Sequence, residues 1–307
     1  MRRFRSLCRA LIQVVLGALA IQCCHAQSLE PRNYTNLPVG MNFLIFGASH
    51  SSGGIAFDAA LPVRNPELDV WTTVVAYAHA FEFQGQTGRI DLALPYAQMS
   101  GNAEYAGHRT DREQHGFTDS VVRLALNLKG APPLTLPEFA RFEPDLIIGT
   151  SLQITAPTGS YDPEYVVNLG TNRWSFKPEL GLSKAFGPLS LELAGAVTLF
   201  TQNTNFYGGS TRRQDPLYSV QVHGVYNFAT AVWASISATY YGGGRTYVND
   251  VADDDRQENW RIGAAFSVPI GRHFSVKLSA SDGVYARTGN NMSLLSLALQ
   301  TRWGGGL

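Results

Sequence analysis

Nine charged residues fall at alternate positions within stretches that otherwise alternate apolar with small or polar side chains. Side chains on a β-strand point to opposite faces in turn, so each charge shares a face with small or polar neighbours. Both signs occur. This suits either a pore lined by opposed charges or a set of ion pairs that fill and brace a narrow barrel. The candidate lumen-lining residues are Arg89, Asp91, Arg123, Asp145, Lys177, Glu179, Glu192, Arg261 and Lys277.

Histidine and serine offer a second chemistry, because some twelve-stranded outer-membrane barrels are phospholipases. A hydrolase of that type needs a histidine and a serine close together on the lipid-facing side of neighbouring strands. His223 instead shares the face of Ser219 and Gln221, which the alternation places inside. We therefore interpret His223 as a lumen or structural histidine, and we expect no catalytic residue.

The acidic run Asp253–Asp255 is the candidate for a metal site, because clustered carboxylate oxygens can hold a divalent cation. The run lacks the spacing and the central glycine of a calcium-binding loop. A solvated extracellular loop is the favoured interpretation, and we expect neither a metal nor a cofactor.

The three cysteines, Cys8, Cys23 and Cys24, lie within the first 26 residues. This stretch has a basic start, a short apolar run and small residues up to Ala26, the pattern of a secretory signal peptide cleaved after Ala26. The mature chain would then contain no thiol for catalysis, a disulfide or a metal. Four of the 24 basic residues would leave with the signal, so that 20 remain against 24 acidic residues. A net charge near −4 argues against a nucleic-acid partner.

Strands must position these side chains, and residues 260–285 show their pattern most clearly. In the first arm Trp260, Ile262 and Phe266 occupy one face, while Arg261 and Ser267 occupy the other. A short turn at residues 269–273 leads into a second arm with the same alternation. A soluble sandwich would bury the apolar face in its core, whereas a membrane barrel would turn it to lipid and keep the polar face inside.

Segments of this kind recur along the chain, and their connectors distinguish the two architectures. Brief connectors such as residues 84–87 and 187–188 alternate with long polar ones such as 51–68 and 101–116. Outer-membrane barrels have short periplasmic turns and long extracellular loops. The sequence therefore predicts an all-β fold, a closed antiparallel transmembrane β-barrel of about 12 strands. The predicted strands lie near residues 41–50, 69–83, 88–100, 117–128, 144–157, 172–186, 188–202, 215–229, 230–242, 257–270, 272–285 and 292–303.

Aromatic residues gather at both ends of the predicted strands, as in the two interfacial girdles of a membrane barrel. We expect three regions: a signal peptide at 1–26, a periplasmic segment at 27–40 that leads into the barrel, and the barrel at 41–307. Residues 134–142 are the one stretch with a helical pattern. The expected location is the bacterial outer membrane, and the expected partners are its lipid and lipopolysaccharide, the barrel-assembly machinery and small solutes.

Four stretches resemble the outer-membrane family named for the meta-pathway of phenol degradation. They are Leu37–Leu44, Asn168–Gly181, Gln214–Tyr218 and Asp254–Arg261, and they mark barrel positions rather than catalytic ones. The resemblance runs through most of the mature chain. It implies a barrel-shaped transporter, of a kind often placed beside genes for aromatic degradation, and it implies no enzyme activity.

Three functions remain in order of preference. The first is an outer-membrane channel for passive uptake of small solutes, with aromatic or hydrophobic compounds as one class. The second is a plugged structural or adhesive barrel that acts through its extracellular loops. The third, and least favoured, is a lipid-modifying enzyme.

Overall fold

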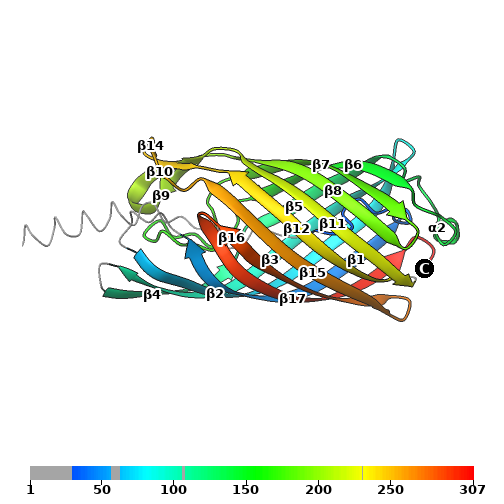
Figure 1. Cartoon of the computed structure of the whole chain (residues 1–307), viewed down its shortest axis with the longest axis horizontal. Helices are drawn as coiled ribbons and strands as arrows, with labels where there is room; N and C mark the ends of the chain where they lie inside the picture. The colour runs from blue at the N-terminus through cyan, green and yellow to red at the C-terminus, as the bar shows by residue number, and fades with distance from the viewer. Residues whose placement is uncertain (1–29, 57–62, 106–107, 230) are drawn as a thin grey trace, which may run out of the picture.

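The computed structural model describes residues 30–307 apart from 57–62, 106–107 and 230. The predicted signal peptide at residues 1–26 lies outside the described residues. Within them, twelve long antiparallel strands form a closed ring (Figure 1). The ring closes because the first strand pairs with both the second strand and the last, and the second strand also pairs with the third. The predicted fold class is confirmed.

Each predicted strand corresponds to one strand of the barrel. Neighbours along the ring are also neighbours in sequence, as in an up-and-down meander. The barrel strands are β1 (Met41–Ala56), β2 (Val63–Phe83), β3 (Gln86–Tyr105), β5 (Ser120–Lys129), β6 (Leu146–Ala156), β7 (Ser175–Phe186), β8 (Leu189–Phe200), β11 (Leu217–Ala229), β12 (Val232–Gly243), β15 (Gln257–Ile270), β16 (Phe274–Ala286) and β17 (Gly289–Gly304).

Two predicted loops are largely strand, and this is a correction. β1, β2 and β3 continue well beyond the predicted loop ends, and β4 (His108–Phe117) pairs with the outer half of β3. Residues 51–56, 63–68, 101–105 and 108–116 therefore extend the barrel wall. Their polar composition resembles that of a loop, because a strand that rises above the membrane has no lipid to face.

At the same end of the barrel lies a small separate sheet (Figure 1). It consists of β9 (Asn203–Phe206), β10 (Ser210–Gln214), β13 (Thr246–Val248) and β14 (Val251–Ala252). The short 3-10 helix η2 (Tyr207–Gly209) joins its first two strands. The opposite end carries short turns and α2 (Leu136–Phe139), the helix predicted within residues 134–142, whose start is capped by Thr135 and Glu138. None of the helices in the described part of the chain is both long and apolar enough to cross a membrane.

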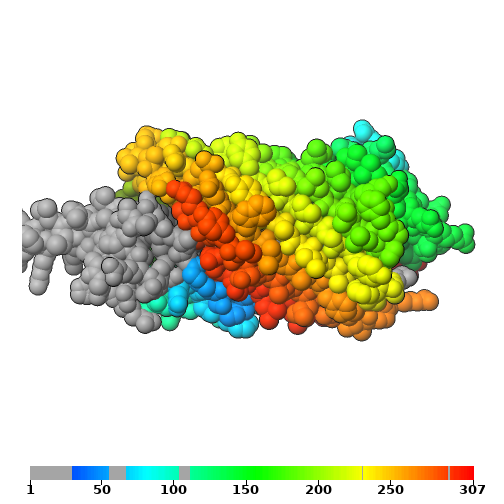
Figure 2. All heavy atoms as spheres, in the orientation of Figure 1, coloured from blue at the N-terminus to red at the C-terminus, as the bar shows by residue number. Residues whose placement is uncertain are grey.

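The outer face of the wall is apolar, as the alternation requires. Ile236 on β12 is 76% exposed, whereas its neighbours Ser235 and Ser237 are buried on the inner face. Exposed aromatic residues such as Trp71 and Trp260 lie towards the loop end, and others such as Phe186 and Trp303 lie towards the turn end. The strands cross an elongated body obliquely, as Figures 1 and 2 show. Apolar residues exposed to this extent on a closed barrel mark the lipid-facing surface.

Residues 30–40, the described part of the predicted periplasmic segment, run alongside the inner wall before β1. The amide of Gly40 donates to the carbonyl of Ala80 on β2, and the amide of Val39 donates to the carbonyl of Leu134. Residues 30–36, called the N-terminal segment below, precede this attachment in the sequence. Their side chains and the backbone amide of Arg32 contact residues of β3, β5, β6, β7, β8, β11 and β12.

Candidate functional site

The first group of inward-facing charges lies on the neighbouring strands β3 and β5. Asp91 is opposite Arg123 in the strand register, and the Nε atom of Arg89 donates to a carboxylate oxygen of Asp91 over 2.8 Å. Arg123 also donates to Gln153 on β6 over 2.6 Å. The alternation predicted that these charges share the inner face, and the register decides which of them come into contact.

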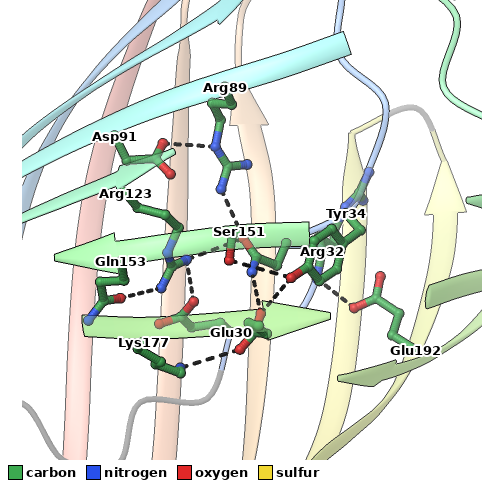
Figure 3. A network of polar contacts seen from close by, with 12 residues as sticks. Glu30, Arg32, Tyr34, Arg89, Asp91, Arg123, Ser151, Gln153, Lys177 and Glu192 are labelled. Carbon is green, nitrogen blue, oxygen red and sulfur yellow. Dashed lines mark hydrogen bonds and ion pairs between the residues drawn. The ribbon is translucent and has the colours of Figure 1, made fainter. Parts of the chain in front are cut away.

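The N-terminal segment completes this group (Figure 3). Glu30 forms an ion pair with Arg123. The side-chain oxygen of Asn33 accepts hydrogen bonds from both Arg89, at 3.1 Å, and Arg123, at 3.2 Å. Hydrogen bonds with a charged partner are stronger than neutral ones. The segment is therefore held to the wall by directional contacts.

A second group of charges lies on β7. Lys177 and Glu179 are two residues apart, and their charged atoms are 3.4 Å from each other. Glu179 accepts two hydrogen bonds from the N-terminal segment, one from the side chain of Asn33 and one from the hydroxyl of Tyr34, each 2.9 Å long. Because Glu179 is buried, these partners compensate for its loss of water.

Glu192 on β8 forms the third attachment. Its carboxylate accepts a hydrogen bond from the backbone amide of Arg32 over 2.7 Å. The guanidinium of Arg32 donates to Asn227 over 3.1 Å and lies 5.3 Å from the ring centre of Trp233. Thus Arg89, Asp91, Arg123, Lys177, Glu179 and Glu192, six of the nine predicted residues, are brought together around one short piece of chain.

The other three predicted residues lie elsewhere. Asp145 is at the turn end, where its largely exposed side chain pairs with Lys184. Arg261 is almost fully buried and donates to Ser281 and to the carbonyl of Met292, so it braces the wall. Lys277 has the inward parity of β16 but is exposed. An exposed side chain on the inner face requires space for water beside it.

The ring of Tyr34 lies directly against two glycines of the wall. Gly149 on β6 and Gly181 on β7 are paired in the register, and a Cβ atom added at either would overlap the ring. Sequence reasoning did not find this contact. A signal was present, because a glycine inside a strand often marks the close approach of another part of the chain.

Space inside the turn-end half of the barrel is divided by the N-terminal segment. A cavity of about 370 Å³ at the mouth is lined by residues that include Arg32, Asp145 and Glu192. A second, separate space of about 10 Å³ lies between the segment and β8 and β11, and its lining includes Gln221 and His223. Such a volume holds about one water molecule.

The inner faces of β11 and β12 are polar. His223 is buried with its Nδ1 atom 2.7 Å from the hydroxyl of Ser237, which agrees with its interpretation as an inward-facing histidine. The side-chain oxygens of Gln221 and Ser235 are buried without a protein hydrogen-bond partner. Polar atoms of this kind are ordinarily satisfied by water or by a polar solute.

Two buried arginines brace the loop end. Burial lowers the pKa of Arg173 well below its ordinary value, and the nearby charge of Arg212 lowers it further. Burial likewise lowers the pKa of Arg212 to about 10. Arg173 stacks 4.4 Å from the ring centre of Phe200, and Arg212 lies 5.4 Å from that of Phe206.

The acidic run Asp253–Asp255 binds neighbouring protein groups. Asp255 accepts hydrogen bonds from the backbone amide and the hydroxyl of Thr246, and Asp254 pairs with Arg287 over 2.8 Å. No group of three or more residues arranged to hold a metal ion occurs among the residues that the structure describes.

Comparison with known proteins agrees with the fold. A solved outer membrane channel from Pseudomonas putida F1 has a TM-score of 0.77 and 21% identity, over 90% of this chain and 100% of that one. The transport unit of the autotransporter AIDA-I from Escherichia coli has a TM-score of 0.52 and 11% identity, over 95% and 97% of the two chains. The beta domain of the Bordetella autotransporter BrkA has a TM-score of 0.51 and 11% identity, over 85% and 99%. No curated protein matches the sequence.

The family itself is identified by its sequence model, which matches residues 51–296. This range includes ten of the twelve barrel strands in full, and the first and last, β1 and β17, in part. Because the match spans well over half of the chain, the protein belongs to the family described as "Putative MetA-pathway of phenol degradation".

Proposed function

We propose that the protein is an outer-membrane channel for the passive uptake of small solutes, and that the N-terminal segment narrows its lumen. One observation carries this proposal: the side chains of the wall do not fill the turn-end half of the lumen. Gly149, Ser151, Gly181 and Ala194 all face inward and leave room there, which the N-terminal segment occupies. A barrel with a purely structural role can fill its interior with side chains of its own wall.

The attachment of the segment is consistent with a removable gate. It joins the wall covalently only through β1, and its remaining contacts are hydrogen bonds, ion pairs and ring packing. These contacts can break without disturbing the backbone ladder of the barrel. The inward-facing charges then have two roles in sequence, since they hold the segment when it is docked and line the lumen when it is not.

Planar-bilayer conductance tests the proposal. A variant that lacks residues 30–36 should show a larger and steadier conductance than the complete protein. If the complete protein and the segment-deleted variant are equally non-conducting while folded, the channel proposal is wrong.

A second function, a structural or adhesive barrel, has one observation in its favour. The loop end carries the separate four-stranded sheet and several arginine–aromatic contacts, including Arg112 at 3.6 Å from the ring centre of Tyr165 and Arg213 at 3.5 Å from that of Tyr247. A rigid loop layer of this kind suits recognition of another surface. Absence of conductance together with loop-dependent cell adhesion would support this alternative.

The proposed route to the membrane follows from the sequence. Cleavage after Ala26 would leave a mature protein with a leading segment at 27–40 and a barrel at 41–307, inserted into outer-membrane lipid and lipopolysaccharide by the barrel-assembly machinery. The strand β17, which ends beside Trp303, supports assembly as the closing strand. Sequencing the N-terminus of the protein isolated from outer membranes tests the cleavage site and the location together.

A further inference from the structure

The aromatic ring of Tyr34 occupies a slot built into the wall of the barrel. Its floor is the paired glycines Gly149 and Gly181, neither of which could carry a Cβ atom in the presence of the ring. Ile147 and Ala194 pack around it in the same buried cluster, and only 4% of Tyr34 is exposed. The slot therefore has the flat shape and the apolar faces that an aromatic ring requires.

One edge of the slot is polar. The Tyr34 hydroxyl donates to Glu179 over 2.9 Å, and it lies 3.4 Å from the hydroxyl of Ser151 (Figure 3). The carboxylate is a strong acceptor, so it favours a hydroxyl donor such as that of a phenol. The slot therefore recognises both a ring and a hydroxyl attached to it.

The slot belongs to the wall, whereas its occupant does not. Gly149, Ser151, Gly181 and Glu179 lie on β6 and β7, whose backbone ladder does not involve the N-terminal segment. Loss of the Tyr34 ring would leave an apolar space of about the size of one ring, with Glu179 at its edge. Glu179 keeps its ion pair with Lys177 but loses the hydroxyl donor of Tyr34. Apolar cavities of that size in proteins bind free aromatic molecules, and the loss of a hydrogen-bond donor to a buried acceptor is costly.

We propose that this slot is a binding site for a solute that carries a hydroxylated aromatic ring, a simple phenol, and that Tyr34 is its internal competitor. The proposal rests on the proposed channel function for its role in uptake, but binding at the slot can be measured without transport. In the docked state Tyr34 supplies the ring and the hydroxyl. A phenolic solute that reaches the slot makes the same contacts and favours the undocked segment.

The contacts also exclude other classes of solute. A benzene or toluene molecule would fill the apolar part but would leave Glu179 without the donor that Tyr34 supplies. Sites built around a hydrogen bond discriminate strongly against ligands that lack it. An aliphatic alcohol would satisfy the carboxylate, but it would pack poorly against the two flat glycine faces.

Ligand-dependent thermal unfolding of Tyr34→Ala in detergent tests the site directly. Phenol should raise the unfolding midpoint of this variant in a saturable way, and benzene should require a concentration about tenfold higher or more for the same rise. The wild-type protein should show no saturable rise, because its own ring fills the slot. In the double variant Tyr34→Ala with Gly181→Val, the valine side chain fills the vacated space, and the phenol effect should disappear.

Two further variants keep the test decisive. Tyr34→Phe keeps the ring but removes the hydroxyl that bonds Glu179, so it is a weaker competitor and should show a phenol effect between those of the wild type and Tyr34→Ala. If Tyr34→Ala does not fold, the barrel that lacks residues 30–36 takes its place, with the same expected response to phenol and to Gly181→Val. A folded variant with an open slot that shows no saturable phenol effect, or an equal effect after Gly181→Val, overturns the proposed site.

Failure of the site and failure of the channel are distinguishable. Saturable phenol binding to Tyr34→Ala without permeation of any small solute into liposomes supports the site and contradicts the channel. If phenol permeates the Tyr34→Ala protein and the added Gly181→Val leaves its rate of permeation unchanged, the channel is supported and the site is contradicted. Saturable binding together with phenol permeation that this valine slows supports both.

Discussion

Replacing Gly181 by alanine should open the channel without damaging the barrel. The residue is in extended backbone on the inner face of β7, where alanine is allowed, but the added Cβ atom would overlap the ring of Tyr34. The ring has little room to move, because Gly149 contacts its other edge and Ile147 and Ala194 enclose it. The strain therefore falls on the docked N-terminal segment and not on the strand ladder.

The size of the effect follows from the overlap. Inserting one methyl group into a closely packed site costs about 1–3 kcal/mol. That cost applies only to the docked state, so it shifts the ratio of undocked to docked protein by roughly 5- to 150-fold. The free energy of unfolding of the barrel itself should change much less, because the undocked barrel has room for the methyl group.

Single-channel recording in planar bilayers measures this shift as open probability. Gly195→Ala on β8 is the matched control, because no atom lies within 4 Å of a Cβ added there. Gly181→Ala should raise the open probability, and Gly195→Ala should leave it at the wild-type value. An unchanged open probability in a folded Gly181→Ala protein would refute the gating role of the segment, and an equal rise in the control would refute the overlap argument.

Three further predictions concern the lipid face, the inner charges and the loops. Ile236→Arg should destabilise the barrel by about 2–4 kcal/mol if the side chain lies near the bilayer midplane, as measured by reversible folding into lipid vesicles. A loss of stability below the error of the measurement would mean that this face does not meet lipid. Arg261→Met should lower the unfolding midpoint, because it removes the hydrogen bonds that Arg261 donates to Ser281 and to the carbonyl of Met292, at a cost of about 1–3 kcal/mol. Lys277→Met should instead shift the reversal potential towards cation selectivity with little loss of stability. The reverse pattern would mean that the two roles are exchanged. The hydrogen bond and charge of Arg287 hold the pKa of Asp254 below its ordinary value. The contact therefore stabilises the loop fully at pH values above the ordinary pKa of an aspartate, and this stabilisation is lost as the pH falls through the lowered pKa. The protection factors of the loop amides, which correct for the intrinsic slowing of exchange at lower pH, should fall on acidification in the wild type, and Arg287→Gln should weaken this pH dependence.

The strands of the barrel could be predicted because their cause is local. Alternation of apolar with small or polar residues specifies two faces, and the lengths of the connectors specify which end is which. The prediction that residues 51–68 and 101–116 form loops was wrong for the same reason. Above the membrane the alternation loses its apolar half, and strands such as β4 then have the composition of a loop.

The parity of the inward-facing charges was also available from the sequence, but their partners were not. Arg89, Arg123, Glu179 and Glu192 lie on four different strands, and the register of these strands decides which side chains meet. From the sequence alone, these charges suit either a lined pore or a set of ion pairs that brace one another. In the structure, each group of charges also binds the N-terminal segment, through contacts with residues 30–34.

By itself, then, the sequence determined the fold class, the number of strands, the lipid-facing side of each strand and the resemblance to the family. All of these depend on side-chain periodicity and on short motifs within one element. Only the tertiary structure decided that a polar stretch ahead of the barrel lies inside it, with the Tyr34 ring on Gly149 and Gly181. No local pattern encodes that placement, because it depends on the shape and charge of a surface that exists only after three strands, more than a hundred residues away, have come into register.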